Sequence, residues 1–265
     1  MGAFLDAFRF LTALPLPPRG RNGGDLAASV AFFPVVGAAL GGAFVLADWA
    51  CGEAFPRVSH LVSAALVLAA YALLTGGLHH DGLMDVADAF WGRRSREERL
   101  RIMKDARAGA LGVTAVALLL LMELAALYAL PARVEASPGR LRWAALLAFP
   151  VLGRWVMSYL CVRFPYARDE GTGAAMIGRA RPSALAAASV LALAALAFAF
   201  VCVVRIPALI PVLCVLALAF AELAGSYLAR SLGGLTGDCV GATGMLCEAL
   251  ALLLLASRVP VLLVG

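Results

Sequence analysis

Residues 60–90 read HLVSAALVLAAYALLTGGLHHDGLMDVADAF, in which a long apolar run leads directly into three aspartates. Such a run is close to the length of about 20 residues that a membrane-spanning helix needs. Asp81, Asp85 and Asp88 follow at i, i+4 and i+7, so they lie within about 60° of one another on one helix face. Carboxylates this close repel one another. We therefore expect a cation among them, in a metal site at the edge of a bilayer.

The rest of the chain is similarly apolar. Its 265 residues are 63% hydrophobic and 15% charged, with a mean hydropathy of +0.90, whereas a soluble domain is about half apolar and a quarter charged. Strand-like alternation is not evident, which disfavours an outer-membrane barrel. We predict an all-α, polytopic membrane helix bundle of about seven transmembrane helices, with residues 1–265 forming a single catalytic domain.

Apolar stretches recur along the whole sequence and predict seven spans. These are residues 27–49, 60–78, 110–130, 141–162, 184–204, 207–229 and 243–264. The first span contains Pro34 and several glycines, which membrane helices tolerate where neighbours pack closely. The six cysteines form no CxxC pair, so we interpret them as small core residues rather than as a disulfide or zinc framework.

Basic residues predict the orientation of these spans. Fifteen Lys and Arg residues lie on the side of the N-terminal segment, residues 79–109, residues 163–183 and Arg230, and six lie on the other side. The positive-inside rule makes the richer side cytoplasmic. The aspartates and the glycine-rich loops all lie on that side. We therefore expect a multi-pass protein of the bacterial inner membrane whose active site faces the cytoplasm.

Two further segments carry polar groups to the same side. In residues 93–112, Asp105 and Arg107 stand just before a span, while most of the other arginines are interpreted as membrane anchors. Residues 233–242 contain four glycines and Asp238, a pattern that lets backbone approach a ligand but that also marks ordinary tight turns. Metal-bound carboxylates together with guanidiniums are what phosphoryl transfer requires. No Walker A motif or GxGxxG fingerprint occurs.

Several polar residues have more than one interpretation. His79 could be a base, a metal ligand, a hydrogen-bond donor to a ligand or a purely structural residue. The aspartate helix could also be a solvated interfacial helix. Charged residues within the spans are costly and usually face a polar cavity. They are Glu123, Arg154, Glu222 and Glu248, of which Arg154 and Glu248 lie toward the cytoplasmic half and could join the site.

Four motifs in order resemble the cobalamin synthase family, the adenosylcobinamide-GDP ribazoletransferases. They are TGGLHHDGLMDVADAF (75–90), RIMKDARAGALG (101–112), PYARDEGTGAAMIGR (165–179) and GGLTGDCVGA (233–242). The resemblance is collinear from the Leu14-Pro15-Leu16-Pro17 segment to Glu248. The family's histidine corresponds to His79, and its Arg-acid-acid-Gly stretch begins at Arg168. Three positions depart from the family pattern: His80, Ala89 and Met245, the last where an acid is expected.

The resemblance implies that adenosylcobinamide-GDP and α-ribazole, or its 5′-phosphate, react to give adenosylcobalamin, or its phosphate, and GMP. It implies Mg²⁺ as cofactor, with Mn²⁺ as an alternative, and as partners a lipid bilayer and a second copy or other corrinoid-pathway enzymes, but no nucleic acid. The expected metal ligands are Asp81, Asp85, Asp88, Asp105 and Asp238. The expected catalytic residues are Asp81, Asp85, Asp105, Arg107 and His79. The expected substrate-binding residues are Arg93, Arg154, Arg168, Thr236 and Gly237.

Two other functions are consistent with parts of the pattern. A CDP-alcohol phosphotransferase also places spaced aspartates at a membrane face, but its motif begins Asp-x-x-Asp-Gly, and here Leu78 stands three residues before Asp81. An ion-coupled transporter would carry acids near the midplane, often in repeated halves. The aspartates here lie at the ends of spans instead.

Overall fold

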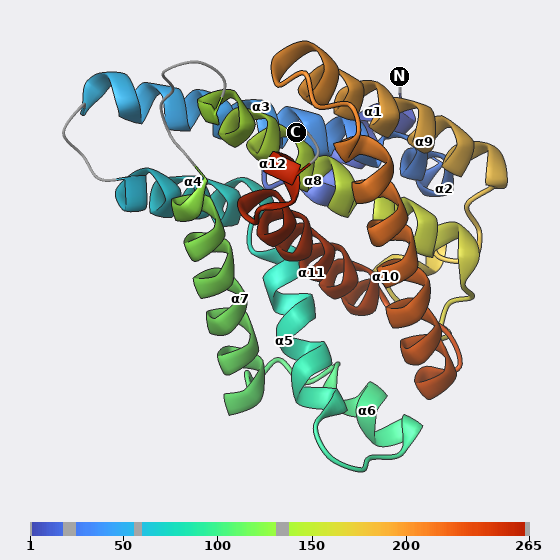
Figure 1. Cartoon of the computed structure of the whole chain (residues 1–265). Helices are drawn as coiled ribbons and strands as arrows, with labels where there is room; N and C mark the ends of the chain where they lie inside the picture. The colour runs from blue at the N-terminus through green and yellow to red at the C-terminus, as the bar shows by residue number, and fades with distance from the viewer. Residues whose placement is uncertain (1, 18–24, 56–59, 131–137, 263–265) are drawn as a thin grey trace.

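The computed structural model describes residues 2–17, 25–55, 60–130 and 138–262, which are mostly helical (Figure 1). The longer helices are α1 (Gly2–Leu11), α3 (Phe33–Ala54), α4 (His60–Thr75), α5 (Leu78–Phe90), α7 (Ala110–Ala129), α8 (Pro138–Arg163), α9 (Pro182–Ala197), α10 (Leu209–Leu232) and α11 (Gly237–Ala256). The short ones are α2 (Leu26–Ser29), η1 (Val30–Phe32), α6 (Arg96–Ile102), η2 (Thr172–Ala175), η3 (Phe198–Val203) and α12 (Val259–Leu262). Within these ranges the β pairing is one isolated bridge, between Tyr166 and Leu235. The predicted all-α class is confirmed.

Six helices of the described chain are long and apolar enough to cross a membrane, and a bent pair, α4 with α5, makes a seventh if it counts as one span. This confirms the expected multi-pass bundle. The last span differs from the prediction of residues 243–264, because α11 begins at Gly237 and ends at Ala256. Residues 263–264 of that predicted span lie outside the described residues. Since α11 begins early, Asp238 lies in the first turn of a helix rather than in a loop.

The second predicted span, residues 60–78, is broken by two glycines. Helix α4 ends at Thr75, and Gly76 and Gly77 adopt left-handed φ angles of 62° and 69°. Glycine reaches this region without the steric penalty of a side chain. The axis turns by 90° between α4 and α5. Helix α5 then runs beside α7 and against α11 (Figure 1), so the corner aims the aspartate helix along these neighbours.

Helices α8 and α11 form the centre of the bundle and are the most buried of the candidate spans. Helix α3 packs along α8 through its glycines, since a Cβ at Gly41 would lie 2.7 Å from the Cα of Leu147. Helix α11 contacts α5, α7, α8 and α10. One cluster of buried apolar side chains runs through these helices. The first turn of α11 is therefore held by packing on several sides.

A buried ion pair changes the interpretation of one basic residue. Arg142 is one of the six basic residues that the sequence assigns to loops on the less basic side. Its side chain is fully buried, however, and lies 2.7 Å from Asp48 of α3. The indole of Trp143 and the hydroxyl of Ser63 also donate to Asp48. A charge paired inside the bundle carries no information on orientation. Four other counted arginines, Arg19, Arg21, Arg57 and Arg133, lie outside the described residues.

Candidate active site

The polar segments that follow α5, α8 and α10 meet at one end of the bundle, as the sequence predicts. Arg96 of α6 donates to the carbonyl oxygens of Leu232 at 2.7 Å and Ala167 at 3.1 Å. The Tyr166–Leu235 bridge joins the segment after α8 to the one after α10. Because each of these bonds links residues far apart in sequence, the three segments hold one another in place.

Helices α5 and α11 approach closely through two glycines. A Cβ at Gly82 would lie 3.0 Å from the Cα of Asp238, and a Cβ at Gly241 would lie 3.0 Å from the imidazole Cδ2 of His79. A larger residue at either position would push the helices apart. The glycines therefore bring the first turn of α11 against the face of α5 that begins with His79, and they place Asp238 beside Asp81.

The charges at this contact are mostly negative. Asp85 is repelled by Asp238, Asp81 and Asp88, and Arg168 is the cation that opposes this repulsion. The Arg168 guanidinium lies 3.3 Å from the Asp238 carboxylate and also donates to the carbonyl of Met103 at 3.2 Å. The positive end of the α11 dipole favours an acid at Asp238. We call Asp81, Asp85 and Asp238 the carboxylate cluster. One arginine offsets only part of the negative charge of this cluster.

Asp88, the third aspartate of the helix, has a different set of partners. Its two carboxylate oxygens accept the backbone N–H groups of Gly109 at 2.8 Å and Gly112 at 2.9 Å. These amides belong to the N-terminus of α7, whose first N–H groups lack partners within the helix. Asp88 therefore caps α7 from another helix. The sequence predicts it as a metal ligand, and the structure shows both its oxygens already bonded.

Asp105 and Arg107 form a local pair at the surface. The Arg107 guanidinium donates to Asp105 at 2.7 and 3.0 Å, and its side chain is 88% exposed. These hydrogen bonds lower the pKa of the Asp105 carboxyl to about 2. Among the described residues, no group of three or more His, Cys, Asp or Glu side chains is arranged to hold a metal ion. The predicted set of five ligands is therefore not assembled around one point.

Arg154 lies in the core of the bundle, away from the carboxylate cluster. Its fully buried side chain pairs with Glu248, and Tyr71 donates to the same carboxylate at 2.6 Å. Glu123 is also fully buried, and neither of its oxygens has a hydrogen-bond partner in the described chain. In this arrangement the Arg154 guanidinium contacts Glu248 and Tyr71, so its predicted role in substrate binding stays a prediction. The sequence does not predict the hydrogen bond from Tyr71 to Glu248, because a tyrosine in an apolar run looks like any other core residue. The same is true of the Asp48–Arg142 pair.

The remaining predicted residues fall into two environments. Thr236 is buried, and its hydroxyl accepts the N–H of Cys239 and so caps α11. Gly237 is the first residue of that helix, while Arg93 is exposed at the surface. His79 is buried, and its Nδ1 has no hydrogen-bond partner among the described residues. Of these four, Gly237 and His79 also line a cavity.

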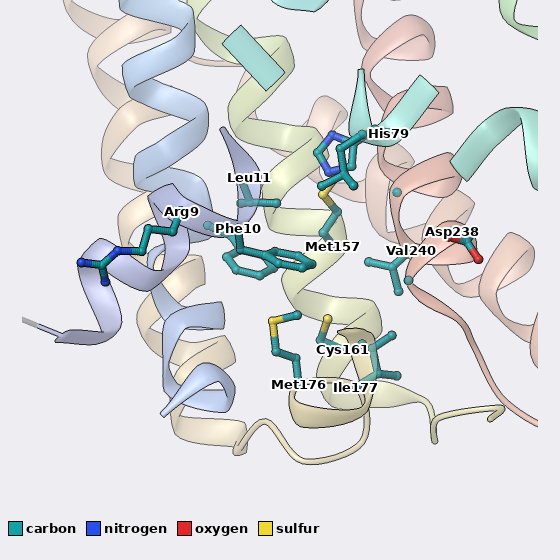
Figure 2. A pocket seen from close by; sticks show the side chains of 15 residues that line it. Arg9, Phe10, Leu11, His79, Met157, Cys161, Met176, Ile177, Asp238 and Val240 are labelled. Carbon is teal, nitrogen blue, oxygen red and sulfur yellow. The ribbon is translucent and has the colours of Figure 1, made fainter. Parts of the chain in front are cut away.

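That cavity has a volume of about 280 Å³ and adjoins the carboxylate cluster through Asp238 (Figure 2). Its wall is mainly apolar and comes from α1, α3, α5, η2, α8 and α11. In Figure 2 the charged ends of Arg9 and Asp238 point away from the centre, while Phe10, Met157 and Cys161 border it. These residues give no signal in the sequence, because apolar side chains from distant segments look like ordinary core residues until the fold brings them together.

Comparison with known proteins places the sequence in a family. The model of a family described as cobalamin-5-phosphate synthase matches residues 3–256. The chain belongs to the cobalamin-5-phosphate synthase family. The match covers every motif from which the resemblance was inferred. The chain is therefore a transferase of cobalamin synthesis.

Individual relatives of the cobalamin-5-phosphate synthase family are similar over almost their whole length. The adenosylcobinamide-GDP ribazoletransferase of Roseiflexus sp. (strain RS-1) is 37% identical over 263 residues, covering 98% of this chain and 91% of the relative. That of Chlorobaculum tepidum is 39% identical over 259 residues, covering 97% and 95%. That of Geotalea daltonii is 35% identical over 264 residues, covering 96% of each. No solved structure matches.

Proposed function

We propose that the protein transfers the cobinamide-phosphate group of adenosylcobinamide-GDP to a ribose hydroxyl of α-ribazole or its 5′-phosphate. The relatives named above carry this activity in their names. The observation that carries the proposal is the contact of α5 with α11 at Gly82. It joins acids from two distant motifs and an arginine from a third, Arg168, at one place.

The proposed reaction exchanges the phosphoanhydride bond of the diphosphate for a phosphodiester bond. The ribose oxygen of the acceptor forms a bond to the phosphorus next to cobinamide, while the bond from that phosphorus to the bridging oxygen of the diphosphate breaks. GMP leaves with the bridging oxygen. The hydroxyl proton passes to a nearby base, for which we propose a carboxylate of the cluster. The products are adenosylcobalamin, or its 5′-phosphate, and GMP.

We propose that Mg²⁺, or Mn²⁺ in its place, binds together with the substrate diphosphate. Magnesium is commonly held by one or two carboxylates plus substrate phosphates rather than by a complete protein cage. The carboxylate cluster fits this mode, because it offers oxygen donors and uncompensated negative charge without a closed set of ligands. Asp81 and Asp85 would hold the ion, with Asp238 next to them. When bound, the ion would neutralise charge on the diphosphate.

The chain's own cations have separate tasks in this proposal. Arg168 is held through its Nη2 by the Met103 carbonyl and by Asp238. We propose that its other amino group, Nη1, donates to a phosphate oxygen at the cluster. A guanidinium in this position stabilises charge that develops on phosphorus during transfer. Arg93 and Arg107 are exposed on the same end of the bundle and would contact the nucleotide from outside. Asp105 keeps Arg107 oriented through its two hydrogen bonds.

Replacing Asp85 by Asn tests the proposal. Membranes carrying the Asp85→Asn variant should form GMP and the cobalamin product from adenosylcobinamide-GDP and α-ribazole at least about 100-fold more slowly. Glu97→Gln is the matched control, because Glu97 is an exposed acid of α6. Normal turnover by Asp85→Asn would remove this residue from the site. Turnover of CDP-alcohols by the wild-type protein would show that it is a CDP-alcohol phosphotransferase instead. Cation flux without product formation would show that it is a transporter.

The orientation is part of the proposal. We infer that the carboxylate cluster faces the cytoplasm across the bacterial inner membrane, since the more basic segments lie at that end of the bundle. Arg93 is exposed and follows the C-terminal end of α5. After replacement of the exposed Cys202, the Arg93→Cys variant should react with a membrane-impermeant thiol reagent in inverted vesicles but not in intact spheroplasts. Labelling only from outside would reverse the orientation.

A further inference from the structure

We propose that the 280 Å³ cavity beside the carboxylate cluster binds the aromatic base of the acceptor nucleoside, the 5,6-dimethylbenzimidazole ring of α-ribazole. The inference rests on the proposed function and adds to it a location for one substrate. It also names the side chains that select that substrate. The cavity is lined by residues from six helical segments and shares Asp238 with the cluster (Figure 2).

The size of the cavity limits what it can hold. Pockets for whole small molecules have volumes of about 300–1,000 Å³, so a cavity of about 280 Å³ accommodates one fused ring system with part of a sugar. A corrin macrocycle with its amide side chains is far larger. The cavity therefore fits a nucleoside end of the reaction rather than the cobinamide.

The chemistry of the wall selects between the two nucleosides of the reaction. Phe10, Met157, Cys161, Met176 and Ile177 surround the space and offer no strong hydrogen-bonding group on their side chains. Guanine carries several donors and acceptors on its ring edge, and burying them without partners is unfavourable. A dimethylbenzimidazole ring carries two methyl groups and, once attached to ribose, a single free ring nitrogen. Arg9 and Asp238 also line the cavity, but their charged ends point away from its centre (Figure 2), so the wall suits the benzimidazole better than guanine.

His79 supplies a partner for that one nitrogen. Its side chain is 4% exposed, it lines the cavity, and its Nδ1 has no hydrogen-bond partner among the described residues. Buried polar groups are rarely left unpaired. A neutral imidazole with its proton on Nδ1 donates one hydrogen bond. Because Nδ1 is itself buried, the imidazole must turn toward the cavity for this N–H to reach the single acceptor of the base. Because Asp238 belongs to both the cavity wall and the carboxylate cluster, a ring in the cavity can place the attached ribose next to the cluster.

The main test narrows the cavity. Cys161 is buried on α8 and its sulfur faces the space (Figure 2), so Cys161→Phe places a ring there. The matched control is Cys214→Phe, because Cys214 lines a second apolar cavity of about 260 Å³ between α8, α9 and α10. We expect Cys161→Phe to raise KM for α-ribazole about tenfold or more and to leave KM for adenosylcobinamide-GDP within about twofold. Cys214→Phe should change neither.

A second measurement does not depend on how much of the variant folds. The ratio of kcat/KM for α-ribazole to kcat/KM for the riboside of unsubstituted benzimidazole is independent of the active fraction. Cys161→Phe should shift this ratio toward the smaller base. Direct binding of α-ribazole to protein in nanodiscs, followed by the fluorescence of the benzimidazole, should weaken in parallel. For His79, the riboside of indole, which lacks the second ring nitrogen, should bind the wild type more weakly than α-ribazole does.

The outcomes separate this inference from the proposed function. An unchanged base ratio in a Cys161→Phe protein that still turns over would overturn the cavity assignment. So would a rise in KM for adenosylcobinamide-GDP alone, which would place guanine there. If the wild-type protein forms no cobalamin product from either base, the proposed function itself fails, and binding of α-ribazole in nanodiscs then decides separately whether the cavity is a base site.

Discussion

Replacement of Asp88 distinguishes a helix cap from a metal ligand. Asp88 accepts two backbone N–H groups at the start of α7, from Gly109 and Gly112. A hydrogen bond to a charged group contributes about 1.5–3 kcal/mol, so loss of two at a partly buried site costs about 3 kcal/mol at the lower end. Relief of the repulsion with Asp85 returns about 0.5–1 kcal/mol. We expect Asp88→Ala to lower the free energy of unfolding by about 2 kcal/mol.

Two comparisons sharpen this expectation. Asp88→Asn keeps one carbonyl oxygen as an acceptor and should cost less, about 0.5–1 kcal/mol. Asp85→Ala removes a carboxylate that other carboxylates repel, so it should leave the stability unchanged or raise it. The contrast in sign between positions 85 and 88, both on α5, follows from their different partners and not from their spacing.

The assay is unfolding of purified protein in mixed micelles with increasing SDS, in the presence of EDTA so that no divalent ion contributes. Hydrogen exchange at the amides of Gly109 and Gly112 gives a local readout, and it should accelerate in Asp88→Ala but not in Asp85→Ala. Equal stability changes at the two positions, with slow exchange at both glycines, would falsify the cap and return Asp88 to the predicted metal ligands.

Three other predictions follow from close contacts and ion pairs. Arg154→Met leaves Glu248 buried without its partner and should lower the free energy of unfolding by about 3–5 kcal/mol in the same assay. Adding Glu248→Gln to this variant should restore part of that free energy. If the effects of the two substitutions simply add, the two residues are not paired. Gly82→Val should abolish cobalamin formation because it moves α5 away from Asp238. Gly42→Val is the control and should remain active, since there is open space around the Cβ position of Gly42. Equal activities of the two variants would count against the contact. Arg107→Gln should raise the pKa of Asp105 from about 2 toward 3.8, which carboxyl NMR would detect. Because the pKa of Asp105 is lower in the folded protein, the ion pair stabilises the fold above pH 3.8, and this stabilisation is lost toward pH 2. The pH profile of activity near neutral pH should show no new titration.

The sequence predicts most of what depends on local pattern. Apolar length alone identifies the membrane helices, because a bilayer sets a fixed span and leaves a strong compositional signal. The motifs place Asp81, Asp85, Asp238 and Arg168 on polar segments expected at one end of the bundle, and the structure brings these segments together. The family follows from the same motifs, because their order along the chain is itself the evidence.

Tertiary structure decides which partner each side chain has. Asp81, Asp85 and Asp88 look equivalent by spacing, yet Asp88 caps α7 because that helix begins beside it, while Asp85 faces α11. The 90° corner at Gly76 and Gly77 was not predicted, since two glycines after a span are equally consistent with an ordinary end. Pairs such as Asp48 with Arg142, and the cavity beside His79, join residues from separate helices. Helix periodicity determines which face a residue occupies, but only packing determines what that face meets.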